Sequence, residues 1–139
     1  MERASRIIHK LELGELYSKY AIKEEPIGHG SYGTVYSGRD KTTNEKVAIK
    51  ILREFPDDTL DRKRLFREIK LLHMLEGRAN TVCLKHITTS THDDTFFGMA
   101  FIFERHESDL SRIIASRQPL TTPHLQYFLY QMLYGVHYI

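Results

Sequence analysis

The sequence predicts an α+β domain in which a five-stranded antiparallel sheet carries one helix and is followed by two more helices. Three observations predict this fold. Short β-rich segments with close turns fill much of residues 20–103, and strands joined so closely pair as an antiparallel meander. A helical apolar repeat interrupts these strands over residues 60–76. Two further helical patterns follow the last strand, one over residues 108–117 and one that starts after Thr121-Thr122-Pro123 and runs to Ile139.

These elements are preceded by a leader, residues 1–19, of mixed charge. A short helix packed on the domain could form within it. Strands are expected over residues 20–27, 34–37, 47–52, 82–88 and 96–103. Polar turns are expected at residues 40–44 and 90–94. The helix over residues 60–76 begins after the N-cap candidates Asp57, Asp58 and Thr59 and ends at Gly77.

Composition narrows the class of protein. With 139 residues, 41% of them hydrophobic and 27% charged, the chain resembles soluble globular domains. A net charge of +2 gives no indication of a nucleic-acid partner, and the longest apolar run, residues 96–103, is too short to span a membrane. The single cysteine, Cys83, favours a cytoplasmic location, with the nucleus as a second compartment. The eight histidines show no metal-ligand spacing, so no metal site is expected.

A glycine pattern, Gly28-x-Gly30-x-x-Gly33, fits three kinds of phosphate site. A dinucleotide-binding turn requires a helix directly after it, whereas residues 34–36 are strand-like. A Walker-type loop requires lysine where Thr34 stands. The third kind is a hairpin whose tip folds over the phosphates of ATP, because glycine lets backbone N–H groups approach oxygen atoms closely. An ordinary glycine-rich hairpin remains the alternative. The candidate loop residues are Gly28, His29, Gly30, Ser31, Tyr32, Gly33 and Thr34.

Lys50 ends an otherwise apolar strand, Val47-Ala48-Ile49-Lys50. Ala48 and Lys50 share one face of this strand, so a flat ring could lie over Ala48 with a phosphate at Lys50. The alternative is a strand-end lysine that reaches solvent. In the next helix, Glu68 falls within the apolar stripe of Leu65, Ile69, Leu72 and Leu75. A carboxylate facing the core needs a cation. Lys50 is favoured over Arg64, which lies one turn earlier on the helix.

The order of glycine hairpin, Val-Ala-Ile-Lys strand and helix with a core-facing Glu68 resembles the small lobe of protein kinases. Three segments are similar to MAP kinases in particular: residues 67–72 (Arg-Glu-Ile-Lys-Leu-Leu), 107–110 (Glu-Ser-Asp-Leu) and 126–131 (Gln-Tyr-Phe-Leu-Tyr-Gln). Cyclin-dependent kinases share the layout, but their regulatory helix and hinge differ. The resemblance implies a leader over residues 1–19, a small lobe over 20–103, and the hinge and start of a helical large lobe over 104–139.

The resemblance also implies a role for each matching residue. Lys50 would hold the α- and β-phosphates of ATP, oriented by Glu68. Phe103 would guard the pocket behind the adenine, and Asp109 would lie near the ribose. Arg67 would bind an activation-loop phosphate, although a solvated basic face shared with Arg62, Lys63 and Arg64 is an equal alternative. Ile27, Val35 and Ala48 would sandwich the adenine, and the backbones of Glu104 and His106 would hydrogen-bond its edge, with His106 departing from the usual apolar residue.

The family's His-Arg-Asp and Asp-Phe-Gly motifs do not occur in the 139 residues. The catalytic aspartate and the Mg²⁺ ligands are therefore expected beyond Ile139, and the 139 residues alone are expected to be inactive. The expected function is the ATP-binding part of a MAP-kinase-type Ser/Thr kinase with protein substrates and an upstream MAP kinase kinase. The alternatives are a non-catalytic short form that binds a nucleotide or a partner, and a fragment of a related kinase. The intact glycines, Lys50 and Glu68 favour the enzyme.

Overall fold

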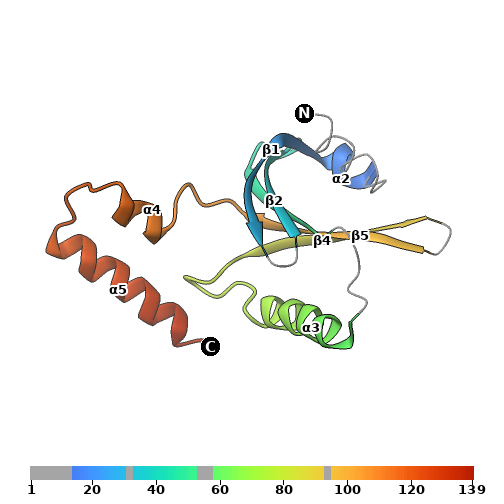
Figure 1. The fold of residues 1–139 in the computed structure, drawn as a ribbon. Helices are drawn as coiled ribbons and strands as arrows, with labels where there is room; N and C mark the ends of the chain where they lie inside the picture. Colours follow the sequence, from blue (N-terminus) through green and yellow to red (C-terminus); the bar gives the residue numbers. More distant parts are fainter. Residues whose placement is uncertain (1–13, 31–32, 53–57, 93–94) are drawn as a thin grey trace.

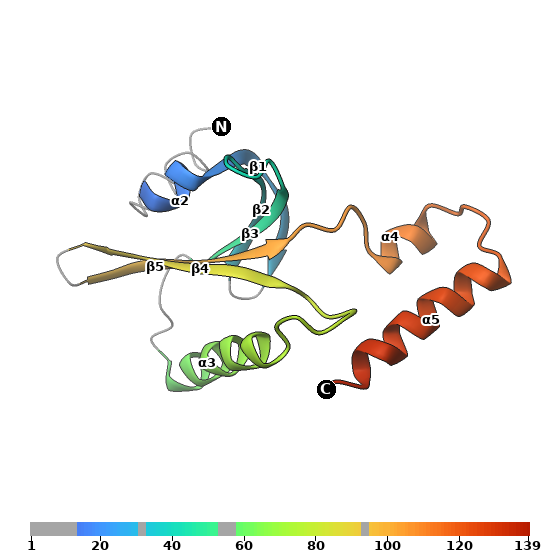
Figure 2. The ribbon, with the colours of Figure 1, turned by 180° about the vertical axis from the view of Figure 1, so that it is seen from behind.

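The computed structural model describes residues 14–30, 33–52, 58–92 and 95–139. Ser31 and Tyr32 of the glycine loop, Asp57 and most of the leader lie outside these ranges. A sheet forms the centre of the molecule, with helix α2 on one side and helix α3 on the other (Figures 1 and 2). Helices α4 and α5 lie beyond one end of the sheet (Figure 1).

The sheet has five strands in the order β1-β2-β3-β5-β4, and every neighbouring pair is antiparallel. This confirms the predicted sheet. The hairpin of β4 and β5 extends further than predicted, because backbone pairing continues from Ser90 opposite Gly98 to His92 opposite Thr95. Part of the expected turn at residues 90–94 is therefore strand. The strands are β1 (Tyr20–Gly30), β2 (Gly33–Asp40), β3 (Lys46–Leu52), β4 (Leu84–His92) and β5 (Thr95–Glu104).

The two faces of the sheet carry different residues. On β3, the side chains of Val47, Ile49 and Ile51 are buried on the side of α2, which we call the outer face. Ala48 and Lys50 alternate with them and lie on the opposite side, which we call the inner face. Residues directly opposite each other in a sheet share a face. The inner face therefore also carries their register partners, Val35, Ser37, Phe101 and Phe103.

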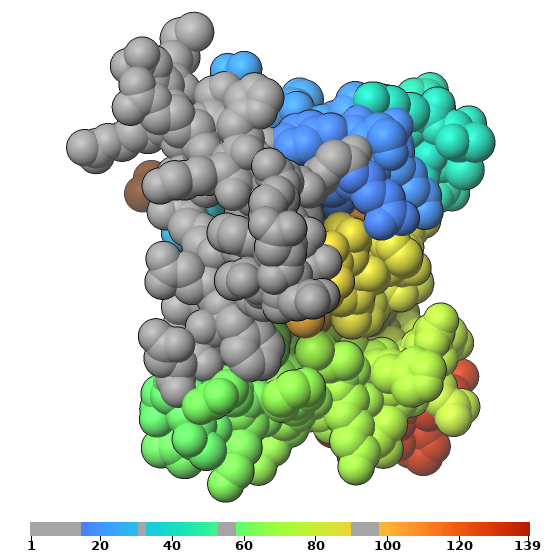
Figure 3. All heavy atoms as spheres, turned by 90° about the vertical axis from the view of Figure 1, so that its right-hand side faces the viewer, coloured from blue at the N-terminus to red at the C-terminus, as the bar shows by residue number. Residues whose placement is uncertain are grey.

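The outer face is covered by α2 (Gly14–Lys19). Leu16 is 1% exposed and joins Tyr20, Tyr36 and Ile49 in one core cluster. Lys41 Nζ donates to the carbonyl oxygen of Tyr17 at 2.6 Å, which ties the helix to the turn after β2. The expected short helix in the leader is confirmed for these residues. Figure 3 shows β4 lying between the α2 and α3 layers.

The inner face is covered by α3 (Thr59–Met74). Leu65 is buried, and Ile69 and Leu72 pack with it against Leu52 and Phe101. The predicted apolar stripe therefore faces the sheet. The helix ends two residues before the predicted Glu76, with Leu75 as its C-cap. Gly77 follows with φ +71°, the left-handed conformation expected after a helix.

Two helices follow the sheet: α4 (Leu110–Ala115) and α5 (Thr122–Val136). The prediction that the last helix reaches Ile139 is wrong. After Val136, the N–H groups of Tyr138 and Ile139 donate to carbonyl oxygens three residues earlier, in a tighter turn. No helix in the described ranges is long and apolar enough to cross a membrane.

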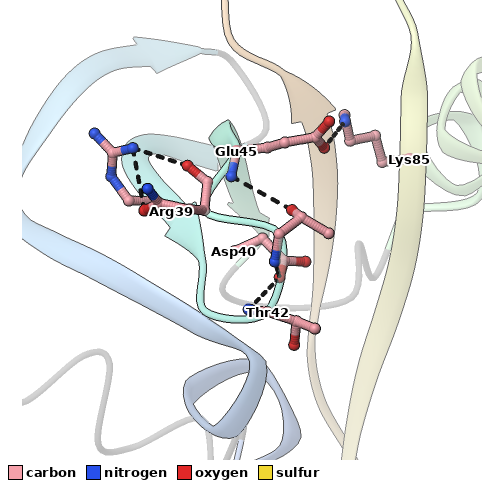
Figure 4. Close-up of polar contacts among 7 residues, drawn as sticks. Arg39, Asp40, Thr42, Glu45 and Lys85 are labelled. Atoms are coloured by element: carbon pink, nitrogen blue, oxygen red, sulfur yellow. Dashed lines mark hydrogen bonds and ion pairs between the residues drawn. The ribbon is translucent and has the colours of Figure 1, made fainter.

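The turn between β2 and β3 is held by its own polar groups (Figure 4). Asp40 Oδ1 accepts from the N–H groups of Thr42 at 2.8 Å and Thr43 at 3.0 Å, and these bonds lower the pKa of Asp40. Lys85 on β4 pairs with Glu45 at 2.6 Å. The turn fixes the register of β2 against β3, which places Val35 opposite Lys50 and Ser37 opposite Ala48.

Candidate functional site

An ion pair joins the sheet to α3 on the inner face. Lys50 Nζ lies 2.6 Å from Glu68 Oε1, and the two side chains are 17% and 32% exposed. The same Nζ lies 5.7 Å from the centre of the Phe101 ring. Arg64, the alternative partner, donates to Asp61 Oδ1 at 2.9 Å. The predicted pairing of Lys50 with Glu68 is confirmed. An ammonium group has three donors, so Lys50 retains the capacity to bind an anion.

A half-buried apolar surface adjoins this cation. Val35 lies directly opposite Lys50, and Ala48 lies two residues before it on the same face. Phe103 faces Ala48 from β5, and its ring centroid lies 6.3 Å from that of Phe101. The inner face thus offers a flat ring an apolar wall, with a positive charge beside it for a phosphate.

The three glycines of the loop differ in how much space surrounds the position of a Cβ atom. A Cβ atom on Gly28 would meet no heavy atom of the described residues within 4 Å, and one on Gly30 would lie 3.8 Å from the Gly33 carbonyl oxygen. In the described ranges the only glycine with positive φ is Gly77. Within the described part of the chain, neither a positive φ nor packing requires glycine at positions 28 and 30, so a ligand has room to approach the backbone there. Gly33 has a packing role, because its Cβ would lie 2.3 Å from the Ile51 carbonyl oxygen.

Other predicted site residues lie around this surface. Thr34 is buried and lies opposite Ile51, a residue of the outer face, so it can contribute only its backbone to a ligand on the inner face. His29 lies opposite Thr34. Ile27 is 41% exposed and lies within an irregularity of the pairing of β1 with β2, between Pro26 and Gly28. Arg67 is exposed on α3.

The backbone at the end of β5 and just after it is the part of the chain that the resemblance assigns to the edge of the adenine. The N–H of Glu104 donates to the Cys83 carbonyl oxygen at 3.1 Å, so Glu104 can offer a ligand its carbonyl oxygen but not its N–H. His106 is exposed and lies outside any strand or helix. Asp109 caps α4, with Oδ1 accepting from the Arg112 N–H at 2.8 Å. The structure therefore gives the Asp109 carboxylate a local partner.

Two contacts of this segment were missed by sequence reasoning. Arg105 Nη1 donates to Ser37 Oγ at 2.6 Å, across 68 residues of sequence. Lys46 at the start of β3 forms an ion pair with Glu107, and this contact lowers the pKa of Glu107. No local pattern marks these pairs. Only the strand register, which brings β2, β3 and the end of β5 together, could have indicated them.

Comparison with known proteins identifies the family. The sequence profile of the protein kinase domain matches residues 21–139. The chain belongs to the protein kinase family. It is 42% identical over 127 residues to mitogen-activated protein kinase 4 of Oryza sativa subsp. japonica. The aligned region covers 91% of the chain and 34% of that relative. It is also 43% identical over 125 residues to mitogen-activated protein kinase 13 of Arabidopsis thaliana. This aligned region covers 90% of the chain and 34% of that relative.

The chain thus spans about a third of the length of these relatives. Its five-stranded sheet with α3 is the small lobe of the protein kinase fold, and α4 and α5 are early helices of the large lobe. Protein kinases use ATP and Mg²⁺. In the part of the chain that the structure describes, no group of three or more His, Cys, Asp or Glu could hold a metal ion. The described residues therefore fit the nucleotide, but they do not supply a metal site.

Proposed function

We propose that this chain is the ATP-binding part of a MAP-kinase-type Ser/Thr protein kinase, which transfers the γ-phosphoryl group of ATP to protein hydroxyls. The observation that carries the proposal is the ion pair of Lys50 and Glu68 beside the apolar inner face. A charged pair there stabilises a fold little, whereas a fixed cation beside an apolar wall suits a nucleotide. The similarity to MAP kinases supports the same assignment.

The proposed roles follow the geometry. Lys50 binds the α- and β-phosphates, held in place by Glu68. The open positions at Gly28 and Gly30 let the loop backbone approach the phosphates. Ile27, Val35 and Ala48 contact the adenine, with Phe103 behind it. The carbonyl oxygen of Glu104 and the N–H of His106 bind its edge.

Three parts of the proposal concern the wider protein. Protein substrates and an upstream MAP kinase kinase are the proposed partners, and Arg67 is the proposed contact for a phosphate on the activation loop. The proposed division of the chain is a leader over residues 1–19, a small lobe over 20–103, and the hinge with the first part of the large lobe over 104–139. Mg²⁺ would neutralise phosphate charge when bound, and no described residue is assigned to it.

Calorimetric titration of the chain with ATP tests the nucleotide site. We expect Lys50→Met to weaken ATP binding by about tenfold or more, because it removes a charge-assisted contact to phosphate. Gly30→Ala should also weaken ATP binding without lowering the melting temperature, since among the described residues a Cβ there would be in no more than ordinary van der Waals contact. Lys23→Met, a change of an exposed lysine on β1, is the matched control. Absence of ATP binding, or equal affinity in Lys50→Met and the control, would contradict the proposal.

Phosphoryl transfer needs the motifs that the 139 residues do not contain. A chimera in which this chain replaces the matching third of the rice relative supplies them. We expect the chimera to phosphorylate a general protein substrate of MAP kinases, and Lys50→Met to reduce its rate by about 10²-fold or more. A folded chimera that binds ATP but transfers no phosphate would contradict the catalytic part of the proposal.

A further inference from the structure

We propose that Arg105 is a positioning residue for adenine recognition, which holds the hinge backbone at a fixed distance from the inner face through its hydrogen bond to Ser37. This inference rests on the proposed ATP site. Arg105 Nη1 donates to Ser37 Oγ at 2.6 Å. Ser37 is only 3% exposed, so the bond is largely shielded from water.

The position of Ser37 gives this bond its significance. Ser37 lies opposite Ala48 on β2, and Ala48 lies opposite Phe103 on β5. These three residues form one row across the inner face. The guanidinium group therefore reaches from the hinge, across β3, to the strand beyond Ala48. It bridges the two parts that an adenine must contact together, namely the apolar wall and the hinge backbone.

Arg105 lies between the two residues that present this backbone, Glu104 and His106. The N–H of Glu104 is held by the Cys83 carbonyl oxygen at 3.1 Å. The hinge is thus tied to Cys83, the residue before β4, through Glu104 and to β2 through Arg105. A third tie, the ion pair of Lys46 with Glu107, is exposed on both sides, at 48% and 67%, and is weakened by salt. Of the two ties made by charged side chains, the part-buried bond of Arg105 is the one that ionic strength affects less.

The burial of Arg105 argues against a role in stability alone. Within the described ranges, its Nε is buried and has no hydrogen-bond partner. A buried donor without a partner is unfavourable for folding, so leucine at this position should fold at least as well as arginine. What leucine cannot do is bond Ser37. The stability of the fold and the position of the hinge should therefore respond differently to this substitution.

Calorimetry with two ligands separates these roles. Adenosine reports on the adenine site, and inorganic tripolyphosphate reports on Lys50 and the loop. We expect Arg105→Leu and Ser37→Ala each to weaken adenosine binding by about threefold to tenfold. Tripolyphosphate binding should not fall in either variant, and the melting temperature should not fall in Arg105→Leu. Ser37→Ala leaves the Arg105 donor without this partner, so a lower melting temperature is expected there and only its two ligand affinities are compared. The double variant should be no weaker than either single variant, because both remove the same bond.

Two further variants complete the experiment. Arg105→Lys keeps a donor that can reach Ser37 and should restore part of the adenosine affinity. Arg39→Leu removes an arginine of β2 whose contacts are with Asn44 in the turn, and it should bind both ligands normally. The inference is wrong if Arg105→Leu binds adenosine as the unaltered chain does, if it weakens both ligands equally, or if its melting temperature falls in step with affinity. If the unaltered chain binds neither ATP nor adenosine, the proposed function fails first, and this inference fails with it.

Discussion

Lys50 and Glu68 are each unfavourable for the fold without the other. Both side chains are mostly removed from water, at 17% and 32% exposed, between the sheet and an apolar helix face. Removing one partner leaves the other charge poorly solvated, whereas replacing both with apolar residues is often neutral. The pair is therefore better explained by what it binds than by what it stabilises.

If the two charges are coupled, substitutions at Lys50 and Glu68 should have non-additive effects on stability. We expect Lys50→Met and Glu68→Met each to lower the free energy of unfolding by about 1–2 kcal/mol, less than for a fully buried pair because both groups retain some water. The double variant should be close to the unaltered chain. Denaturant unfolding of the four proteins measures the coupling. The exposed pair Arg64 and Asp61 is the control and should show coupling near zero; additive losses at Lys50 and Glu68 would show that the pair is not coupled.

Tyr17 gives the fold a dependence on alkaline pH. Burial, with a smaller contribution from Tyr36, raises the pKa of Tyr17 from its ordinary 10.0 to about 12. The unfolded chain releases this proton at lower pH than the folded chain. The contribution of Tyr17 to the free energy of unfolding is therefore fully present below pH 10 and is lost as pH rises toward 12.

Tyr17→Phe should remove this part of the alkaline destabilisation. It should also raise the free energy of unfolding at neutral pH by about 1 kcal/mol, because the Tyr17 hydroxyl is buried without a partner among the described residues. Denaturant unfolding at a series of pH values measures both effects. Tyr130→Phe, the same change on an exposed ring of α5, is the control. A pH profile of Tyr17→Phe that parallels the control would contradict this account of Tyr17.

At the scale of elements, α5 approaches the loop between α3 and β4 closely at Gly135. A Cβ on the buried Gly135 would lie 2.7 Å from the Asn80 carbonyl oxygen. Asn80 itself has φ 58°, a left-handed conformation that limits how the loop can move away. Nearby, the Arg78 guanidinium lies 5.5 Å from the centre of the Tyr138 ring. Glycine at position 135 therefore allows the close contact with Asn80, although it is a poor helix former.

Gly135→Ala should therefore destabilise the domain although alanine favours helix by about 1 kcal/mol. We expect a loss of about 1–2 kcal/mol from overpacking, with faster amide exchange at the loop that contains Asn80. Helix content by circular dichroism should not fall. Gln126→Ala, at an exposed position of the same helix, should be neutral. Greater stability in Gly135→Ala would show that the helix does not depend on this contact.

The sequence predicted those elements whose pattern is local. The alternation of β3 and the apolar stripe of α3 each depend on one face being buried, and together they predicted the contact of Lys50 with Glu68. The end of α5 was not predictable, because apolar residues continue to Ile139 and carry no stop signal. The bond of Arg105 to Ser37 depends on register across three strands, which neither segment encodes alone.

At the scale of the molecule, α5 presents apolar side chains that nothing in the described part of the chain covers. Leu133 and Val136 of α5 are 61% and 64% exposed, and Ile139, which follows the helix, is 85% exposed. A helix that is apolar on all sides is usually buried in a larger assembly, and an exposed patch of this kind favours association. The exposed apolar residues of α5 are Leu125, Tyr127, Leu129, Tyr130, Met132, Leu133, Tyr134 and Val136.

The 139-residue polypeptide by itself should therefore self-associate through α5. Burial of a large side chain contributes about 1.5–3 kcal/mol, so covering about half of these residues would contribute roughly 10 kcal/mol, which is comparable to the whole stability of a typical domain. Sedimentation velocity over a range of concentrations should show oligomers. The double variant Leu129→Glu with Leu133→Glu should be monomeric and should retain the sheet by circular dichroism, whereas Leu60→Glu, at an exposed position on α3, should associate like the unaltered chain. A polypeptide that stays monomeric at high concentration and unfolds cooperatively would show that α5 is stable in water, and that its apolar surface does not drive association.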